Sequence, residues 1–115
     1  MTSVVMTRGV EFPIEWIFKT APTVVKNLTG YEVLIQIRPS AQSTTLIKEW
    51  TEASGEVLFT PATGSVKLTL KPSTTLAFDF KQAVMDCWVY NGVTDTDGDR
   101  SPVVSITLDH GVSRL

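Results

Sequence analysis

The sequence predicts an all-β fold, a single β-sandwich of about seven strands. Apolar and polar residues alternate with a period of two along most of the chain, which is typical of half-buried strands. Turn residues interrupt this alternation at intervals close to those of a sandwich. The 115 residues suffice for one core, and the longest apolar runs fall far short of the ~20 residues that span a bilayer. We therefore expect one domain without a membrane segment.

The first predicted strand is Val10–Phe18. Its alternation directs Phe12, Trp16 and their apolar neighbours to one face and the glutamates to the other. Pro13 has no backbone N–H, so this strand is expected at a sheet edge or at a bulge. Residues 1–9 show little alternation, and we expect them to form a flexible N-terminal arm ahead of a sandwich domain over residues 10–115.

The next three predicted strands are separated by clear turn signals. Tyr31–Arg38 begins after the turn residues 27–30 and is followed by a proline. Thr44–Trp50 and Glu56–Thr60 flank the segment "TEASGE", whose Gly55 allows a tight connection. These strands are therefore expected to follow one another as a meander.

A half-buried strand and then a break in the pattern come next. In "SVKLTLKP" the apolar residues alternate with lysine and threonine, which predicts one wet face. The following "STTLAFDFKQA" loses the alternation, and Ser73 or Thr74 is expected to cap a short helical turn. Leu76, Phe78 and Phe80 are predicted to close one end of the core, so the segment is interpreted as a linker between the sheets.

The last two strands are predicted to form a hairpin. Ala83–Tyr90 is apolar on both faces, which indicates a central strand, and it leads through the Gly- and Asp-rich "NGVTDTDGDRSP" to Val103–Leu108. Seven short strands with one sheet crossing fit an immunoglobulin-like β-sandwich, with a small β-barrel as the alternative. The cysteine pair of antibody-type domains is missing, because Cys87 is the only cysteine and is expected to be buried.

Composition and motifs argue against catalysis and nucleic-acid binding. The net charge of −2 and the scattered basic residues give no general attraction to polyanions. The only histidine, His110, belongs to no spaced catalytic motif. We expect a protein that is not an enzyme, with no catalytic residues, no cofactor and no small-molecule substrate.

The loop "DTDGDR" is the one candidate for a metal site. Asp95, Asp97 and Asp99 alternate as the oxygen ligands of calcium loops do. The glycine and the final glutamate of an EF-hand loop do not fall at the required positions, and Asp-Gly is a common turn signal. A solvated turn is therefore the preferred interpretation, and no metal ligand is predicted.

Asn27 to Thr29 form a glycosylation sequon, and the three tryptophans are candidate contact residues. No secretory signal precedes the sequon, so it is interpreted as turn chemistry. Trp16 and Trp88 are assigned to the core. Trp50 lies at a strand end beside charged residues, which makes it the tryptophan expected to contact a partner.

The order of short motifs resembles that of a known family. "G-x-x-F" at Gly9–Phe12 precedes "LTGYEVLIQIR" at Leu28–Arg38, then come "SGEV", "GSVKLTL", "TTLAF" and "AVMDCWVYN", and an Asp-Gly loop leads to a last strand closing with "GVSR". This resembles a family of small bacteriophage and prophage virion proteins, and the predicted architecture resembles the N-terminal domains of phage baseplate and tail proteins. The match departs from the family pattern at "DCWVYN" and "HGVSR".

The resemblance implies a structural role in a virion. It implies a tail, baseplate or head–tail component that contacts other virion proteins, forms a homo-oligomer and assembles in the host cytoplasm. The alternative is a ligand-binding or adhesion module that uses Trp50, Tyr31 or Tyr90 together with the acidic loop and calcium.

Overall fold

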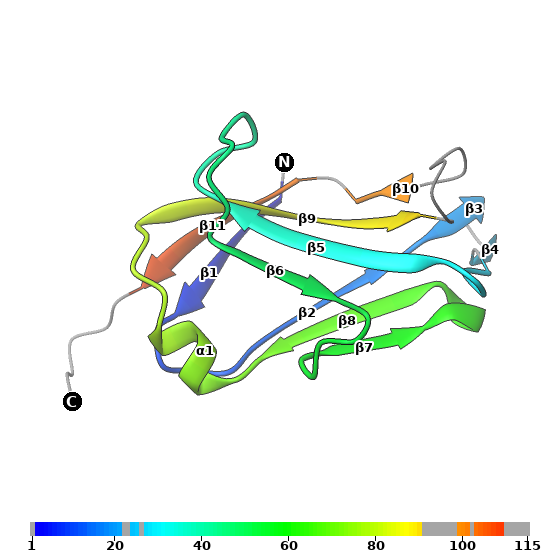
Figure 1. Cartoon of the computed structure of the whole chain (residues 1–115), viewed down its shortest axis with the longest axis horizontal. Helices are drawn as coiled ribbons and strands as arrows, with labels where there is room; N and C mark the ends of the chain where they lie inside the picture. Colours follow the sequence, from blue (N-terminus) through cyan, green and yellow to red (C-terminus); the bar gives the residue numbers. More distant parts are fainter. Residues whose placement is uncertain (1, 22–23, 26, 91–98, 102, 110–115) are drawn as a thin grey trace.

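The protein is built of two β-sheets packed face to face, with a short helix at one end (Figure 1). The computed structural model describes residues 2–21, 24–25, 27–90, 99–101 and 103–109. In chain order its elements are β1 (Thr2–Thr7), β2 (Phe12–Ile17), β3 (Lys19–Ala21), β4 (Val24–Val25), β5 (Glu32–Arg38), β6 (Lys48–Thr51), β7 (Val57–Thr60), η1 (Pro61–Thr63), β8 (Ser65–Leu70), α1 (Pro72–Leu76), β9 (Gln82–Tyr90), β10 (Asp99–Arg100) and β11 (Val104–Asp109).

The strand order is that of an immunoglobulin-type sandwich. The larger sheet has the order β1-β11-β9-β5-β6, with β10 also paired to β9, and the smaller sheet has the order β2-β8-β7. β3 and β4 form a separate two-stranded ribbon. The prediction of an all-β sandwich is therefore confirmed, and the described strands do not form the single closed sheet of the alternative barrel.

The core lies between the two sheets and follows the predicted alternation. Val33, Ile35 and Ile37 of β5 are fully buried, and every second residue of β9 from Ala83 to Val89 is buried beside them. Each such aliphatic side chain stabilises the fold by roughly 1.5–3 kcal/mol through burial. β9 pairs with both β5 and β11, so the prediction that it is a central strand is confirmed.

The proline in β2 indicates where this strand lies in its sheet. Phe12, Trp16 and Phe18 face the core, whereas Pro13 is exposed and lies opposite Thr69 of β8. β2 is an edge strand of the smaller sheet, as its proline predicted.

The prediction of a flexible arm over residues 1–9 is wrong for Thr2–Thr7, because these residues form the strand β1. β1 pairs in parallel with β11 from Thr2 opposite Val104 to Thr7 opposite Asp109, and Met6 is fully buried. The pairing partner lies about a hundred positions away in the chain, which is why local alternation did not reveal it.

A set of hydrogen bonds then fixes the crossing from β1 to β2. Gly9, in the left-handed region at φ 81°, donates its N–H to Thr75 Oγ1 at 3.0 Å, and this fully buried hydroxyl donates to the Val10 carbonyl at 2.9 Å. Arg8 Nε donates to the Phe78 carbonyl at 3.0 Å. The start of the chain is thus attached to α1 and to the segment that follows it.

Two further predictions need correction. β6 begins at Lys48 rather than at Thr44, because only Lys48–Thr51 pair with β5. α1 begins with Pro72 after Lys71, and neither Ser73 nor Thr74 is the residue that precedes the helix. The short β3, β4 and β10 were not predicted.

Candidate functional site

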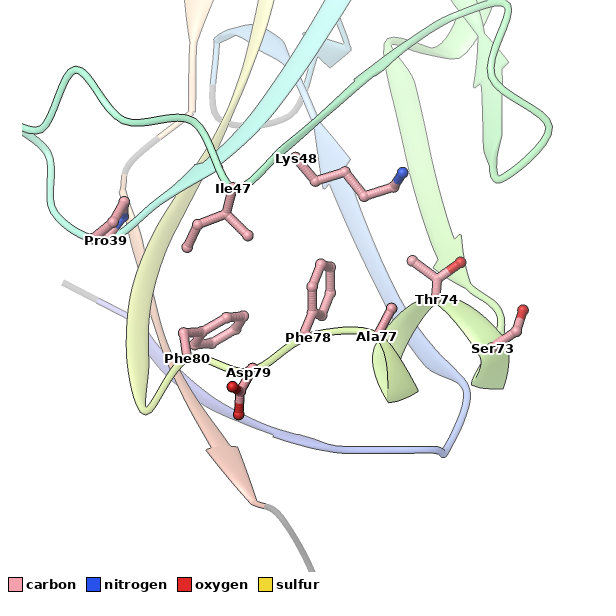
Figure 2. Close-up of a pocket in the computed structure, with 9 residues that line it drawn as sticks. All are labelled: Pro39, Ile47, Lys48, Ser73, Thr74, Ala77, Phe78, Asp79 and Phe80. Atoms are coloured by element: carbon pink, nitrogen blue, oxygen red, sulfur yellow. The ribbon is translucent and has the colours of Figure 1, made fainter. Parts of the chain in front are cut away.

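An open groove of about 680 Å³ lies at the end of the sandwich that α1 closes. It is bounded by the loop after β5, the start of β6, α1, and the link from α1 to β9. Figure 2 shows the residues that line it: Pro39, Ile47, Lys48, Ser73, Thr74, Ala77, Phe78, Asp79 and Phe80. The groove thus joins segments that are about thirty positions apart in the sequence.

The floor of the groove is apolar and aromatic. The rings of Phe78 and Phe80 have centroids 5.5 Å apart and are tilted by 49°, and Figure 2 shows both rings directed toward Ile47. Phe78 is buried, whereas Phe80 and Ile47 are half-buried. Asp79 points to the opposite side, as expected for the middle residue of an extended segment. The prediction that Phe78 and Phe80 close one end of the core is confirmed, whereas Leu76 is 40% exposed.

One rim of the groove carries a cation and two hydroxyls. Lys48 is exposed and extends above Phe78 toward Thr74, with Ser73 next to it (Figure 2). Its Nζ lies 5.7 Å from the centroid of the Trp50 ring, within reach of a cation–π contact. The site therefore offers burial on its floor and polar recognition at its rim.

Glu56 holds the walls of the groove in place. Its carboxylate accepts hydrogen bonds from Trp50 Nε1 at 3.1 Å, from the Lys71 N–H at 2.7 Å and from Thr74 Oγ1 at 2.8 Å. One side chain thereby connects β6 to the first turn of α1. Burial raises the pKa of Glu56, but these hydrogen bonds and the nearby Lys48 charge outweigh it, so the pKa is held below its ordinary value.

The tryptophan assignments from the sequence are partly reversed. Trp16 is buried as predicted, but Trp50, the expected contact residue, is only 2% exposed because it faces the core opposite Ile35. Trp88, which was assigned to the core, is half-buried and faces outward from β9. The signal that was missed is Asp86: a charged residue two positions before Trp88 places both on the outer face.

Trp88 and Tyr90 form an aromatic pair on the outer face of the larger sheet. Their ring centroids are 4.6 Å apart with an angle of 33° between the rings. Leu34 of β5 lies opposite Trp88 in the register. This pair is a second aromatic surface of the described residues, and of its two members only Tyr90 belongs to the residues that the sequence predicts for an adhesion module.

Cys87 is a packing residue rather than a nucleophile. Burial, with a further contribution from the Asp86 charge, raises the pKa of its thiol to about 12. Its backbone N–H donates to Ser101 Oγ at 2.9 Å, and its carbonyl accepts from the Ser101 N–H at 2.8 Å. The predicted burial of Cys87 is confirmed.

The other sequence candidates fall at turns or outside the described residues. Asn27 Oδ1 accepts from the Thr29 N–H at 3.0 Å and from Thr29 Oγ1 at 2.6 Å, and Gly30 has φ 89°, so the predicted turn chemistry is confirmed. Asp95, Asp97 and His110 lie outside the described residues. The backbone of Asp99 belongs to β10, opposite Val89.

Within the described ranges, no group of three or more His, Cys, Asp or Glu side chains is placed to hold a metal ion. No helix in this part of the chain is long and apolar enough to cross a bilayer. No protein-family model matches the chain, and no curated protein matches it. Among the described residues, the groove and the aromatic pair are two candidate contact surfaces.

Proposed function

We propose that this chain is a non-enzymatic structural or assembly protein of a bacteriophage virion, in the tail, baseplate or head–tail region, and that it acts through protein–protein contacts. The observation that carries the proposal is the order of motifs between Gly9 and Arg114, which resembles that of small phage virion proteins. Host cytoplasm is the place of assembly under this proposal.

The groove gives the proposal a physical basis. An aromatic floor formed by Phe78 and Phe80, with Lys48 at the rim, suits an apolar side chain of a neighbouring protein flanked by an acidic group. Hydrogen bonds to Glu56 and from Thr75 attach α1 on two sides, which favours a groove that is already formed before a partner binds. A preformed surface loses less conformational entropy on binding than a mobile one.

The direct test is the protein composition of phage particles. Particles purified from the strain that carries the gene are expected to contain this chain at a fixed ratio to the capsid protein, measured by quantitative mass spectrometry. Neighbouring genes that encode capsid, portal or tail proteins would agree with this result. A chain that is expressed in the producing cells but absent from intact particles would refute the proposal.

The groove is tested by a pair of alanine substitutions. Ala77→Arg places a long charged side chain in the groove, whereas Ala53→Arg places the same side chain in the turn after β6. Both alanines are exposed, so neither change is expected to unfold the protein. Incorporation into particles should fall at least tenfold for Ala77→Arg and stay unchanged for Ala53→Arg. Equal incorporation of the two variants would exclude the groove as the contact surface.

A ligand-binding or adhesion module is the second candidate, because Trp88 and Tyr90 form an aromatic pair on an outer face. Such a platform suits the apolar face of a sugar ring. Glycan-array binding that is lost in Trp88→Ala would favour this function. Calcium titration during thermal melting, with Asp97→Ala as control, tests the metal-dependent version, and an unchanged melting temperature would remove it.

A further inference from the structure

The outer edge of β1 differs from the other sheet edges of the described residues. β1 is the terminal strand of the larger sheet, and Thr2–Thr7 contains no charged residue and no proline. The other edges each have a feature that opposes strand addition: Lys48 and Glu49 on β6, Pro13 on β2, a length of only four residues on β7, and lengths of only two or three residues on β3, β4 and β10. Among these edges, β1 is the one suited to receive another strand.

The hydrogen-bond pattern shows which groups point outward from this edge. The Arg8 N–H donates to the Asp109 carbonyl at 2.8 Å, so Arg8 directs its backbone groups toward β11. Successive residues of a strand direct them to opposite sides, which turns the N–H and C=O groups of Ser3, Val5 and Thr7 to the open edge. The Thr7 carbonyl already accepts from the Val10 N–H at 3.2 Å and retains a second lone pair.

These outward groups are arranged symmetrically about Val5. In an antiparallel pairing centred there, Val5 of each copy exchanges both backbone hydrogen bonds with Val5 of the other, and Ser3 pairs with Thr7. The Val5 side chain is 64% exposed and would cover its counterpart, while the two hydroxyl residues would form a cross-strand pair. The strand brings no charge to the twofold axis, so no like charges oppose the approach.

We infer that two copies of this chain associate by antiparallel β1–β1 pairing about a twofold axis at Val5, which joins their larger sheets edge to edge. The occupant of the edge is a second copy because the pattern Ser3-Val5-Thr7 is complementary to itself. This inference deepens the proposed role in protein–protein contacts and rests on it for its use in a particle.

A matched pair of charge substitutions tests the surface. Val5 and Leu58 are each 64% exposed on an edge strand, so Val5→Lys and Leu58→Lys add the same charge at equivalent exposure on β1 and β7. In sedimentation equilibrium the native chain and Leu58→Lys are expected at about twice the monomer mass of 12.6 kDa, and Val5→Lys at the monomer mass. A native chain that stays monomeric at the highest concentration reached, or a Val5→Lys dimer, would overturn the inference.

Engineered cysteines test the register. Val5→Cys should crosslink to itself on mild oxidation, because opposed residues of this kind have Cα atoms about 5.5 Å apart, within disulfide range. Ser3→Cys and Thr7→Cys should crosslink when mixed and not when alone, since like positions would be separated by about 14 Å along the strands. Buried Cys87 serves as an internal negative control. A Ser3→Cys chain that crosslinks to itself would overturn this register.

The proposed virion role and the β1–β1 pairing are overturned by different experimental results. These measurements use the purified chain alone, so absence from virions would overturn the proposed function and leave the pairing intact. A monomeric chain that is nevertheless found in particles would overturn the pairing and leave the proposed function intact.

Discussion

Replacing Glu56 by glutamine removes the charge that connects β6 to α1 while keeping the shape of the side chain. The carboxylate accepts hydrogen bonds from Trp50, from the Lys71 backbone and from Thr74. A hydrogen bond to a charged acceptor contributes about 1 kcal/mol more to the free energy of unfolding than a hydrogen bond to a neutral acceptor. For the three bonds of Glu56 this difference amounts to about 3 kcal/mol. Because Glu56 is half-buried and water competes for the same oxygens, we expect a loss of about 2 kcal/mol.

The assays are urea unfolding and thermal unfolding at pH 7 and at pH 3, both monitored by tryptophan fluorescence. At pH 7 Glu56→Gln should lower the free energy of unfolding by about 2 kcal/mol and the melting temperature by about 8 °C. Glu49→Gln is the control, because within the described ranges the exposed Glu49 accepts one side-chain hydrogen bond, from Gln36 at 3.0 Å. Its effect should stay within about 0.5 kcal/mol.

The sign of the pH dependence follows from the lowered pKa of Glu56. A carboxyl whose pKa is lower in the folded than in the unfolded chain stabilises the fold above the unfolded value, 4.5 for glutamate, and loses this contribution as the pH falls through the folded pKa. The difference between native chain and Glu56→Gln should therefore shrink toward zero at pH 3. An equal difference at pH 3 and pH 7, or no difference at pH 7, would refute the role assigned to this charge.

Three further predictions concern the hydrogen bonds of Thr75, the strand β1 and the thiol of Cys87. Thr75→Val should lower the free energy of unfolding by roughly 1–3 kcal/mol, because the Gly9 N–H loses its buried acceptor; an unchanged free energy of unfolding would contradict the role of this hydrogen bond. Met6→Ala should lower the free energy of unfolding of the monomer by about 2–5 kcal/mol, whereas Val5→Ala should leave it nearly unchanged. Equal effects of the two substitutions would mean that β1 is not packed on the core. Cys87 should resist alkylation in the native chain up to pH 9 and react once urea unfolds it, since its pKa is raised to about 12; rapid native labelling would contradict its burial.

The strands that the sequence predicted well are those whose signals are local. The alternation in β5 identified its buried residues, and Pro13 identified an edge. In β9 the strand and its central position were predicted, but the presence of apolar residues on both faces hid which face Trp88 occupies. Asp86 lies two positions before Trp88, so both side chains point to the same face of the strand. The charge of Asp86 therefore identifies that face as the outer one.

The features that escaped prediction depend on distant partners. β1 pairs with β11, and the sequence of the six residues in β1 does not indicate that their partner is a strand about a hundred positions away. The groove combines Ile47 with Phe78, and their proximity follows from the packing of α1 against the end of the sandwich. Alternation identifies which side chains turn inward, but it does not indicate where two ends of a fold meet.

The parallel pairing of β1 with β11 also determines how the domain resists a pulling force. The chain enters this pair at Thr2 and leaves it at Asp109, which lie at opposite ends of the two strands. Tension applied through the two ends of the chain would slide β1 along β11 and load all the hydrogen bonds between them at once. An antiparallel pair of terminal strands would open one bond after another under the same load. The first and last strands thus form a mechanical clamp across the domain.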